Sequence, residues 1–243
     1  MQLNLLGVNT TSQTFDDAMN TLAEWAGEHQ KRYICTCPVF TLMSARENPQ
    51  VMQALNQADM VTADGMPIVW LQRRRGNPQA ERVYGPDIMQ VLCSRELRHY
   101  FYGGLPGVAN QLEEKLRIQY SELEIAGKFS PPVATFDGQV DFVEVERLNA
   151  TQADIIWVGL GSPKQDLWMM TYRPHLDAPL LIGVGAAFDF LAGTKKQAPR
   201  WMQRYGLEWL YRLIKEPRRL WKRYLVYNIR FIFEVIRDQM RNK

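Results

Sequence analysis

The fold is decided by the stretch Asp154-Ile-Ile-Trp-Val-Gly-Leu-Gly-Ser-Pro-Lys-Gln-Asp-Leu-Trp-Met-Met-Thr-Tyr172. Its first six residues, Asp154–Gly159, form an apolar run that predicts a buried strand. The residues Lys164–Tyr172 carry apolar side chains at helical spacing and predict an amphipathic helix. Glycines and a proline lie between the two, which is typical of a tight turn from a strand into a helix. The stretch therefore predicts one strand–loop–helix unit.

The same unit recurs through the chain. Further strands are predicted at Leu3–Val8, Arg32–Thr36, Asp59–Thr62, Tyr100–Tyr102, Glu124–Ala126 and Leu180–Gly185. Further helices are predicted at Thr14–Glu28, Phe40–Gln57, Asp87–Leu97 and Gly107–Tyr120. Alternation at this spacing indicates βαβ units. We therefore predict an α/β fold with a Rossmann-like, mainly parallel sheet flanked by helices and a C-terminal helical appendage.

The composition excludes several classes of protein. A chain of 243 residues with 46% hydrophobic and 23% charged residues is globular rather than disordered. Residues Met1–Leu6 lack the basic start of a secretion signal. No window reaches the roughly 20 apolar residues of a membrane-spanning helix. We therefore expect the protein to stay in the cytoplasm.

The cysteines and histidines show no metal-binding or disulfide pattern. Cys35 and Cys37 share an apolar run and Cys93 is distant in sequence, so buried thiols are favoured over ligand or redox roles. The histidines stand singly and are interpreted as structural or surface residues: His29, His99 and His175. No metal and no cofactor are predicted.

The charge is divided between two parts of the chain. Residues 195–243 hold 14 Lys/Arg and 4 Asp/Glu, a balance of +10, whereas residues 1–194 hold 15 and 22, a balance of −7. We therefore predict an α/β catalytic domain over 1–194, called the body, and a basic, aromatic helical appendage over 195–243, called the C-terminal appendage. Such a division indicates an anionic partner for the appendage alone.

Four predicted strands end in glycine or a polar cluster. The loops are Asp59–Pro67, Tyr102–Gly107, Val158–Gln165 and Gly183–Asp189. In parallel sheets ligands bind beyond the carboxyl ends of the strands, glycines let the backbone approach them, and helix N-termini hold phosphate. Each glycine alone could serve only a tight turn, but several at one sheet edge favour a nucleotide-type ligand.

Asp64 is the carboxylate that this pattern singles out. It follows an apolar strand and precedes Gly65, a position facing the ligand crevice. A partly desolvated carboxylate there could act as a general base. The alternative is that Asp64 caps a helix beginning near Pro67. Asp87 and Asp189 are interpreted either as helix caps or as groups that contact the ligand.

Several stretches follow one another in a fixed order along nearly the whole chain. They are Val61–Pro67, Arg82–Asp87, Phe101–Gly104, Gly159–Asp166, Gly183–Asp189, Ala198–Trp201 and Gly206–Arg219. These stretches resemble the WecG/TagA/CpsF glycosyltransferases, glycosyltransferase family 26. The Gly-Ser-Pro-Lys-Gln and Gly-Leu-Glu-Trp runs carry most of the resemblance.

The resemblance implies an inverting hexosyltransferase. It would move an N-acetylmannosamine-type sugar from a UDP donor to a polyprenyl-diphosphate-linked sugar during synthesis of teichoic acids or related surface polysaccharides. It would need no metal and would work at the inner face of the plasma membrane as a peripheral protein.

The resemblance also implies roles for individual residues. Asp64 corresponds to the proposed base, Thr36 to a threonine at the pocket mouth, and Gln165 to the glutamine of its loop. Arg212 and Arg219 correspond to arginines that meet the diphosphate. The remaining predicted substrate-binding residues come from the glycine loops: Gly103, Gly104, Gly161, Ser162, Gly185 and Asp189. The chain departs from the family at Pro38, where an asparagine is usual.

The end of the C-terminal appendage predicts an amphipathic helix from Pro217 onward. On a regular helix its basic residues share an arc of about 100°: Arg219, Lys222, Arg223, Arg230, Arg237 and Arg241. The apolar residues lie mostly opposite: Leu220, Trp221, Tyr224, Phe231, Ile232 and Val235. Binding to an anionic membrane is favoured. Packing on the body and a homo-oligomer contact are alternatives, and nucleic-acid binding is not predicted.

Two other functions fit the sequence less well. An oxidoreductase or methyltransferase with a nucleotide cofactor (NAD or SAM) would need a complete glycine fingerprint, which Gly159-Leu-Gly161-Ser-Pro-Lys164 breaks at its third glycine. A non-enzymatic scaffold at the membrane surface would use only the appendage. It would release no UDP from any UDP-sugar.

Overall fold

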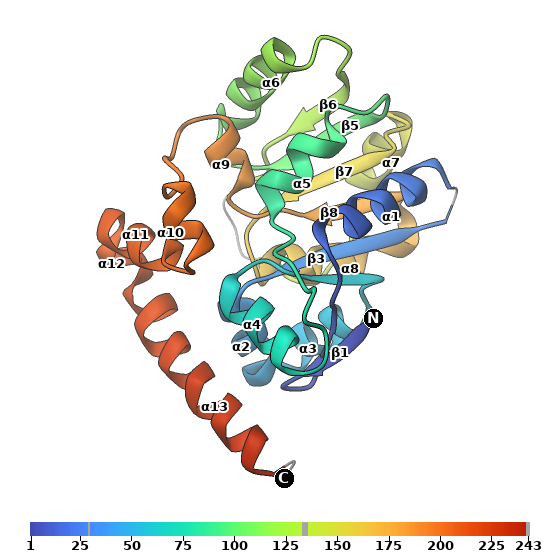
Figure 1. Cartoon of the computed structure of the whole chain (residues 1–243). Coiled ribbons are helices and arrows are strands. Elements are labelled where there is room, and N and C mark those ends of the chain that lie inside the picture. Colours follow the sequence, from blue (N-terminus) through green and yellow to red (C-terminus); the bar gives the residue numbers. More distant parts are fainter. Residues whose placement is uncertain (29, 133–135, 242–243) are drawn as a thin grey trace.

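The computed structural model describes residues 1–28, 30–132 and 136–241 (Figure 1). Six strands form one parallel sheet in the order β4-β3-β8-β7-β5-β6. In chain order they are β3 (Arg32–Cys37), β4 (Met60–Ala63), β5 (Arg98–Gly103), β6 (Glu124–Phe129), β7 (Ile155–Gly159) and β8 (Leu180–Gly183). The predicted α/β fold with a Rossmann-like parallel sheet is confirmed.

Helices cover both faces of the sheet. One face carries α1 (Phe15–Gly27), α5 (Gly85–Leu92), α6 (Val108–Gln119) and α9 (Ala187–Leu191). The other carries α2 (Val39–Glu47), α3 (Pro49–Gln57), α4 (Met66–Arg74), α7 (Phe142–Ala150) and α8 (Lys164–Tyr172). A short 3-10 turn, Arg173–His175, follows α8.

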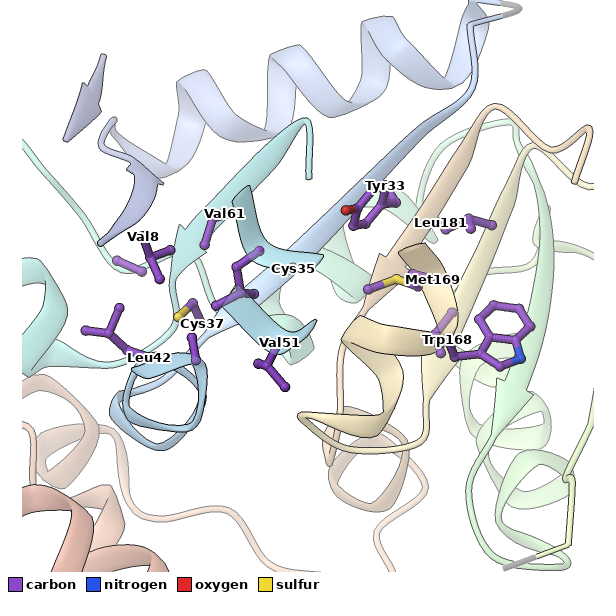
Figure 2. Close-up of a cluster of buried hydrophobic side chains, with 14 of the residues drawn as sticks. Val8, Tyr33, Cys35, Cys37, Leu42, Val51, Val61, Trp168, Met169 and Leu181 are labelled. Carbon is purple, nitrogen blue, oxygen red and sulfur yellow. The ribbon is translucent and has the colours of Figure 1, made fainter. Parts of the chain in front are cut away.

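Successive side chains along a strand point to opposite faces of the sheet, and so into the two helical layers in turn. Tyr33, Cys35 and Cys37 of β3 face the α8 layer, whereas Ile34 faces the α1 layer. Figure 2 shows the core on the α8 side, where Trp168 and Met169 of α8 lie over the sheet. Because both faces are covered, central strands such as Ile155–Gly159 read as continuous apolar runs.

The predicted first strand, Leu3–Val8, is wrong. The chain forms a separate antiparallel hairpin of β1 (Gln2–Leu5) and β2 (Val8–Thr11). Leu6 and Gly7 both have positive φ, 54° and 96°, as a two-residue hairpin turn requires. The apolar run did not indicate this turn, because leucine rarely adopts a positive φ.

Two helix predictions also need correction. The single helix Phe40–Gln57 is two helices, because Pro49 lacks an N–H and Asn48 caps α3 by accepting from the Gln50 amide. Helix α7 was not predicted. Two of its exposed residues, Phe142 and Val143, are apolar, which makes the polar face formed by Glu146 and Arg147 less regular in the sequence.

The C-terminal appendage lies along one side of the body (Figure 1). It consists of α10 (Arg200–Arg204), α11 (Glu208–Lys215), α12 (Pro217–Trp221), a π-helical turn over Lys222–Val226 and α13 (Tyr227–Arg241). Helix α13 packs on α2, where Phe231 is buried in the core and Tyr227 bonds to Glu47 at 2.8 Å. The domain boundary at 194 stays a prediction.

Candidate active site

A cavity of about 340 Å³ opens at the carboxyl ends of the parallel strands. We call it the site cavity. It lies between the body and the C-terminal appendage, which supplies part of its wall. Of the residues predicted to form the site, those lining it are Thr36, Asp64, Gly104, Gly161, Ser162, Gln165, Gly185, Asp189, Arg212 and Arg219.

Asp64 lies directly after β4 and reaches into this cavity, with 18% of its side chain exposed. The N-cap of α4 is Gly65, and no side chain caps that helix. Asp64 is therefore not a helix cap, and the other interpretation, a carboxylate facing the ligand crevice, agrees with its position. Its Oδ1 is buried and accepts no hydrogen bond from the described residues.

The nearest cation to Asp64 is Arg82, whose Nη2 lies 3.7 Å from Oδ1. The same Nη2 lies only 2.6 Å from Oε2 of Glu208, a residue of α11. Arg82 Nε donates to the backbone oxygen of Asp64 at 2.7 Å, and Tyr84 donates to Glu208 Oε1 at 3.0 Å. The guanidinium is thus held by Glu208 more closely than by Asp64.

Burial raises the pKa of Asp64 from 3.8 to about 7. Arg82 lowers that pKa and Glu208 raises it, with smaller lowering effects of Arg212 and Arg223. A carboxyl group that titrates near neutral pH can exchange a proton with a substrate hydroxyl. This is the chemistry that the geometry of the cavity supports.

Gln165 connects two of the glycine loops. Its Oε1 accepts from the amide of Gly161 at 3.1 Å and from that of Gly185 at 3.0 Å. The side chain is 1% exposed, so one amide oxygen fixes both loops beneath the cavity. Thr36 is similarly held, donating to the backbone oxygen of Gly183 at 2.7 Å.

Gly103 is a predicted site residue that is not among those lining the cavity. Its φ is +127°, and a Cβ there would lie 2.6 Å from the carbonyl carbon of Gly159. No L-residue fits such a contact, so Gly103 allows β5 and β7 to approach. Its neighbour Gly104 does line the cavity and donates to the Gly159 carbonyl at 3.1 Å.

The two other aspartates have different surroundings. Asp189 lines the cavity and forms an ion pair with Lys195 at 3.2 Å. Asp87 lies in the first turn of α5, where it pairs with Arg200 of α10 at 3.3 Å. Asp87 thus joins body and appendage, whereas Asp189 is held at the cavity wall by Lys195 and by Thr194, which donates to its Oδ1 at 3.1 Å.

The appendage brings three arginines to the cavity wall. Arg212 lies 5.4 Å from the Phe190 ring, and Arg219 pairs with Glu216. Arg223 lies 4.4 Å from the ring of Phe40, and its Nε is buried without a hydrogen bond to any described residue. Arg219 and Arg223, which the sequence places on one basic arc, both line the cavity.

The remaining cysteines and histidines lie outside this chemistry. Burial raises the pKa of Cys35, Cys37 and Cys93, and all three are free, buried thiols, as predicted. His99 accepts from Trp157 Nε1 at 3.0 Å in the core and His175 is exposed, whereas His29 lies outside the described residues. In the described ranges no three His, Cys, Asp or Glu side chains are grouped to hold a metal ion.

Sequence reasoning assigned no role to Arg82, Glu208 or Tyr84, although it quoted the stretches that contain them. Arg82 and Glu208 are 126 positions apart in sequence. Neither follows a predicted strand, so the pattern of strand ends does not indicate them as site residues. The many charged residues over Gly206–Arg219 are the sequence feature that could have indicated Glu208.

Comparison with protein families gives a match over nearly the whole chain. Residues 3–243 match the family described as "Glycosyl transferase WecG/TagA/CpsF family". The match extends across the body and the C-terminal appendage, so both walls of the site cavity fall within it.

Proposed function

The chain belongs to the WecG/TagA/CpsF family of glycosyltransferases, and we propose that it transfers an N-acetylmannosamine-type sugar from a UDP donor to a polyprenyl-diphosphate-linked sugar. The product would enter the synthesis of a cell-surface polysaccharide of the teichoic acid type. The observation that carries this proposal is Asp64, a carboxylate beside a cluster of arginines whose buried Oδ1 accepts no hydrogen bond from the described residues.

In the proposed reaction Asp64 is the general base. The acceptor hydroxyl forms a bond to the anomeric carbon while the bond from that carbon to the UDP oxygen breaks on the opposite face. The hydroxyl proton passes to Asp64. One displacement of this kind inverts the anomeric centre, and base catalysis typically contributes 10²–10⁴-fold.

The leaving UDP gains negative charge in the transition state, and hydrogen-bond donors that are already in position stabilise that charge. Arg212 and Arg219 line the cavity wall, and guanidinium groups pair well with phosphate oxygens. The amide-rich loops at Gly104, Gly161 and Gly185 lie across the cavity. We assign the diphosphate to the space between these loops and the arginines.

The appendage is proposed to bind an anionic membrane at the inner face of the plasma membrane. Helix α13 has an outer apolar face spanning about 100° of arc, and its residues are 49–68% exposed: Ile229, Ile232, Phe233, Ile236 and Met240. Arg230 and Arg237 border this face on one side and are themselves exposed. Apolar residues bordered by basic ones are typical of helices that lie in a lipid interface. No described helix is long and apolar enough to span a bilayer.

A screen for released UDP tests the function directly. The protein is incubated with UDP-N-acetylhexosamines and their uronic acids, together with a short lipid-diphosphate-sugar acceptor. We expect acceptor-dependent UDP release with one N-acetylmannosamine-type donor. Release with none of the donors would contradict the proposal and leave a non-enzymatic scaffold as the better interpretation.

A further inference from the structure

Glu208 brings a negative charge from the C-terminal appendage to the neighbourhood of Asp64. We infer that Glu208 is a positioning residue that holds Arg82 away from Asp64 and so leaves the Asp64 carboxylate able to take a proton. This inference rests on the proposed function, in which Asp64 is the base.

The distances around Arg82 show that its guanidinium group is bound to Glu208 more closely than to Asp64. Nη2 of Arg82 lies 2.6 Å from Glu208 and 3.7 Å from Asp64, a difference between a hydrogen-bonded and a loose ion pair. Arg82 Nη1 reaches Gln203 at 3.4 Å, and Nε is occupied by the backbone of Asp64. The hydrogen bonds that Arg82 donates therefore go to groups other than the Asp64 carboxylate.

Glu208 is itself fixed at both oxygens. Oε2 accepts from Arg82, and Oε1 accepts from Tyr84 at 3.0 Å. The side chain is 13% exposed, so little solvent competes for it. Arg212, on the same helix, is more distant at 4.0 Å. Glu208 is therefore a firm partner for Arg82 rather than a mobile surface carboxylate.

The other charged or titratable groups near Asp64 come from every element around it. They are Cys37 of β3, Arg82 and Tyr84 before α5, Glu208 and Arg212 of α11, and Arg223 of the π-helical turn. Three of these are cations. With Glu208 neutral, the cations would act on Asp64 without opposition, and Arg82 would be free to pair with it.

Both effects of losing Glu208 have the same sign. An adjacent cation stabilises a carboxylate and lowers its pKa, and a nearby anion raises that pKa. Burial is the largest cause of the raised pKa of Asp64 and Arg82 is the largest opposing cause, so a closer Arg82 would lower that pKa further. Because Glu208 belongs to α11, the proton affinity of Asp64 depends on how the appendage lies against the body.

Carbon-13 NMR of the aspartate carboxyl groups in the full-length protein tests this inference. The Asp64 signal is identified by its absence in Asp64→Asn, and its midpoint is followed by pH titration. In Glu208→Gln we expect the midpoint to fall by at least about one pH unit, a tenfold increase in acid dissociation. An unchanged midpoint would overturn the inference.

Two further variants keep the test decisive. Glu234→Gln removes the same charge from the appendage outside the cavity, where Glu234 pairs with Arg46 at 3.0 Å, and should leave the midpoint unchanged. An equal shift there would assign the effect to overall charge and overturn the inference. If Glu208→Gln does not fold, Glu208→Asp, which shortens the reach to Arg82, should shift the midpoint in the same direction by less. An unchanged midpoint there would also overturn the inference.

The pH profile of kcat/KM separates this inference from the proposed function. The acidic limb should move with the NMR midpoint, whereas a structural defect would lower kcat/KM equally at all pH values. A moving midpoint with a fixed acidic limb would support the role of Glu208 and remove Asp64 as the base. A fixed midpoint would reject Glu208 whatever the activity.

Discussion

At the scale of single residues, the site holds a carboxylate that lowers the stability of the fold but lies where a general base would act. Asp64 is largely buried beside three arginines, yet its pKa is raised to about 7 because burial outweighs their attraction. Its Oδ1 lacks a hydrogen bond from the described residues. A group held in this way reduces the stability of the fold and supplies reactivity in return.

Replacing Asp64 by asparagine should affect activity and stability in opposite directions. The amide cannot take the acceptor proton, so we expect turnover to fall at least about a hundredfold. Calorimetric binding of the UDP-sugar should change little. Near-normal turnover would remove Asp64 from the base role.

The same variant should be more stable than the wild type at alkaline pH. The pKa of Asp64 is about 7 in the folded state, above the ordinary aspartate value of 3.8 that applies to the unfolded chain, so the folded state binds more protons between these values. Stability is therefore lost as pH rises through this window, by up to about 4 kcal/mol. Thermal unfolding should show a larger gain for Asp64→Asn at pH 8 than at pH 5. Equal gains at both would contradict the raised pKa.

At the scale of elements, the helix α13 divides its apolar residues between two faces. Phe231 is buried against the body, whereas Ile232 and Phe233 are exposed. The sequence prediction placed Phe231, Ile232 and Val235 together on one side. Exposed apolar side chains at helical spacing are unusual on a monomer and indicate a surface that is covered by something else.

Phe233→Glu should weaken binding to anionic vesicles. A charge in the middle of the outer apolar face opposes burial in the lipid interface, so we expect at least about a tenfold loss of affinity. Co-sedimentation with phosphatidylglycerol vesicles measures it. Ile118→Glu, which alters an 81% exposed residue of α6 in the body, should bind like the wild type. Equal binding of both variants would contradict membrane docking by α13.

Most strands and the carboxylate could be predicted from the sequence because they depend on local patterns. Apolar runs ending in glycine identify strand ends, and Asp64 follows one of them. The hairpin at Leu6 could not be predicted, since its positive φ is imposed by the packing of β1 and β2. Nor could the pairing of Arg82 with Glu208, which depends on how α11 lies across the body.

At the scale of the whole molecule, two oppositely charged parts share one cavity. The body has a balance of −7 and the C-terminal appendage +10. Contacts between them include Glu47 with Arg230, Arg46 with Glu234, and Arg75 with Asp238. Exposed ion pairs contribute little singly, so the apolar contact at Phe231 carries more of the attachment.

Phe231→Ala should loosen the appendage while leaving the body folded. Removing a buried phenylalanine costs about 3–5 kcal/mol, and here the loss falls on the contact between α13 and the body. Hydrogen exchange should accelerate over 217–241 at least about tenfold, with the sheet unaffected. Phe233→Ala alters the same residue type on the outer face and should leave exchange unchanged. Equal protection in the two variants would show that Phe231 does not hold the helix.

The π-helical turn at Lys222–Val226 makes the length of the chain before α13 matter as much as its composition. It already accommodates one residue more than a regular helix, so a further inserted residue would be taken up by regular winding and would turn α13 by about 100°. Phe231 would rotate away from α2, and part of the outer face would rotate toward it. Point substitutions in this turn should therefore be tolerated far better than single-residue insertions, and natural variation in this segment should not lengthen it.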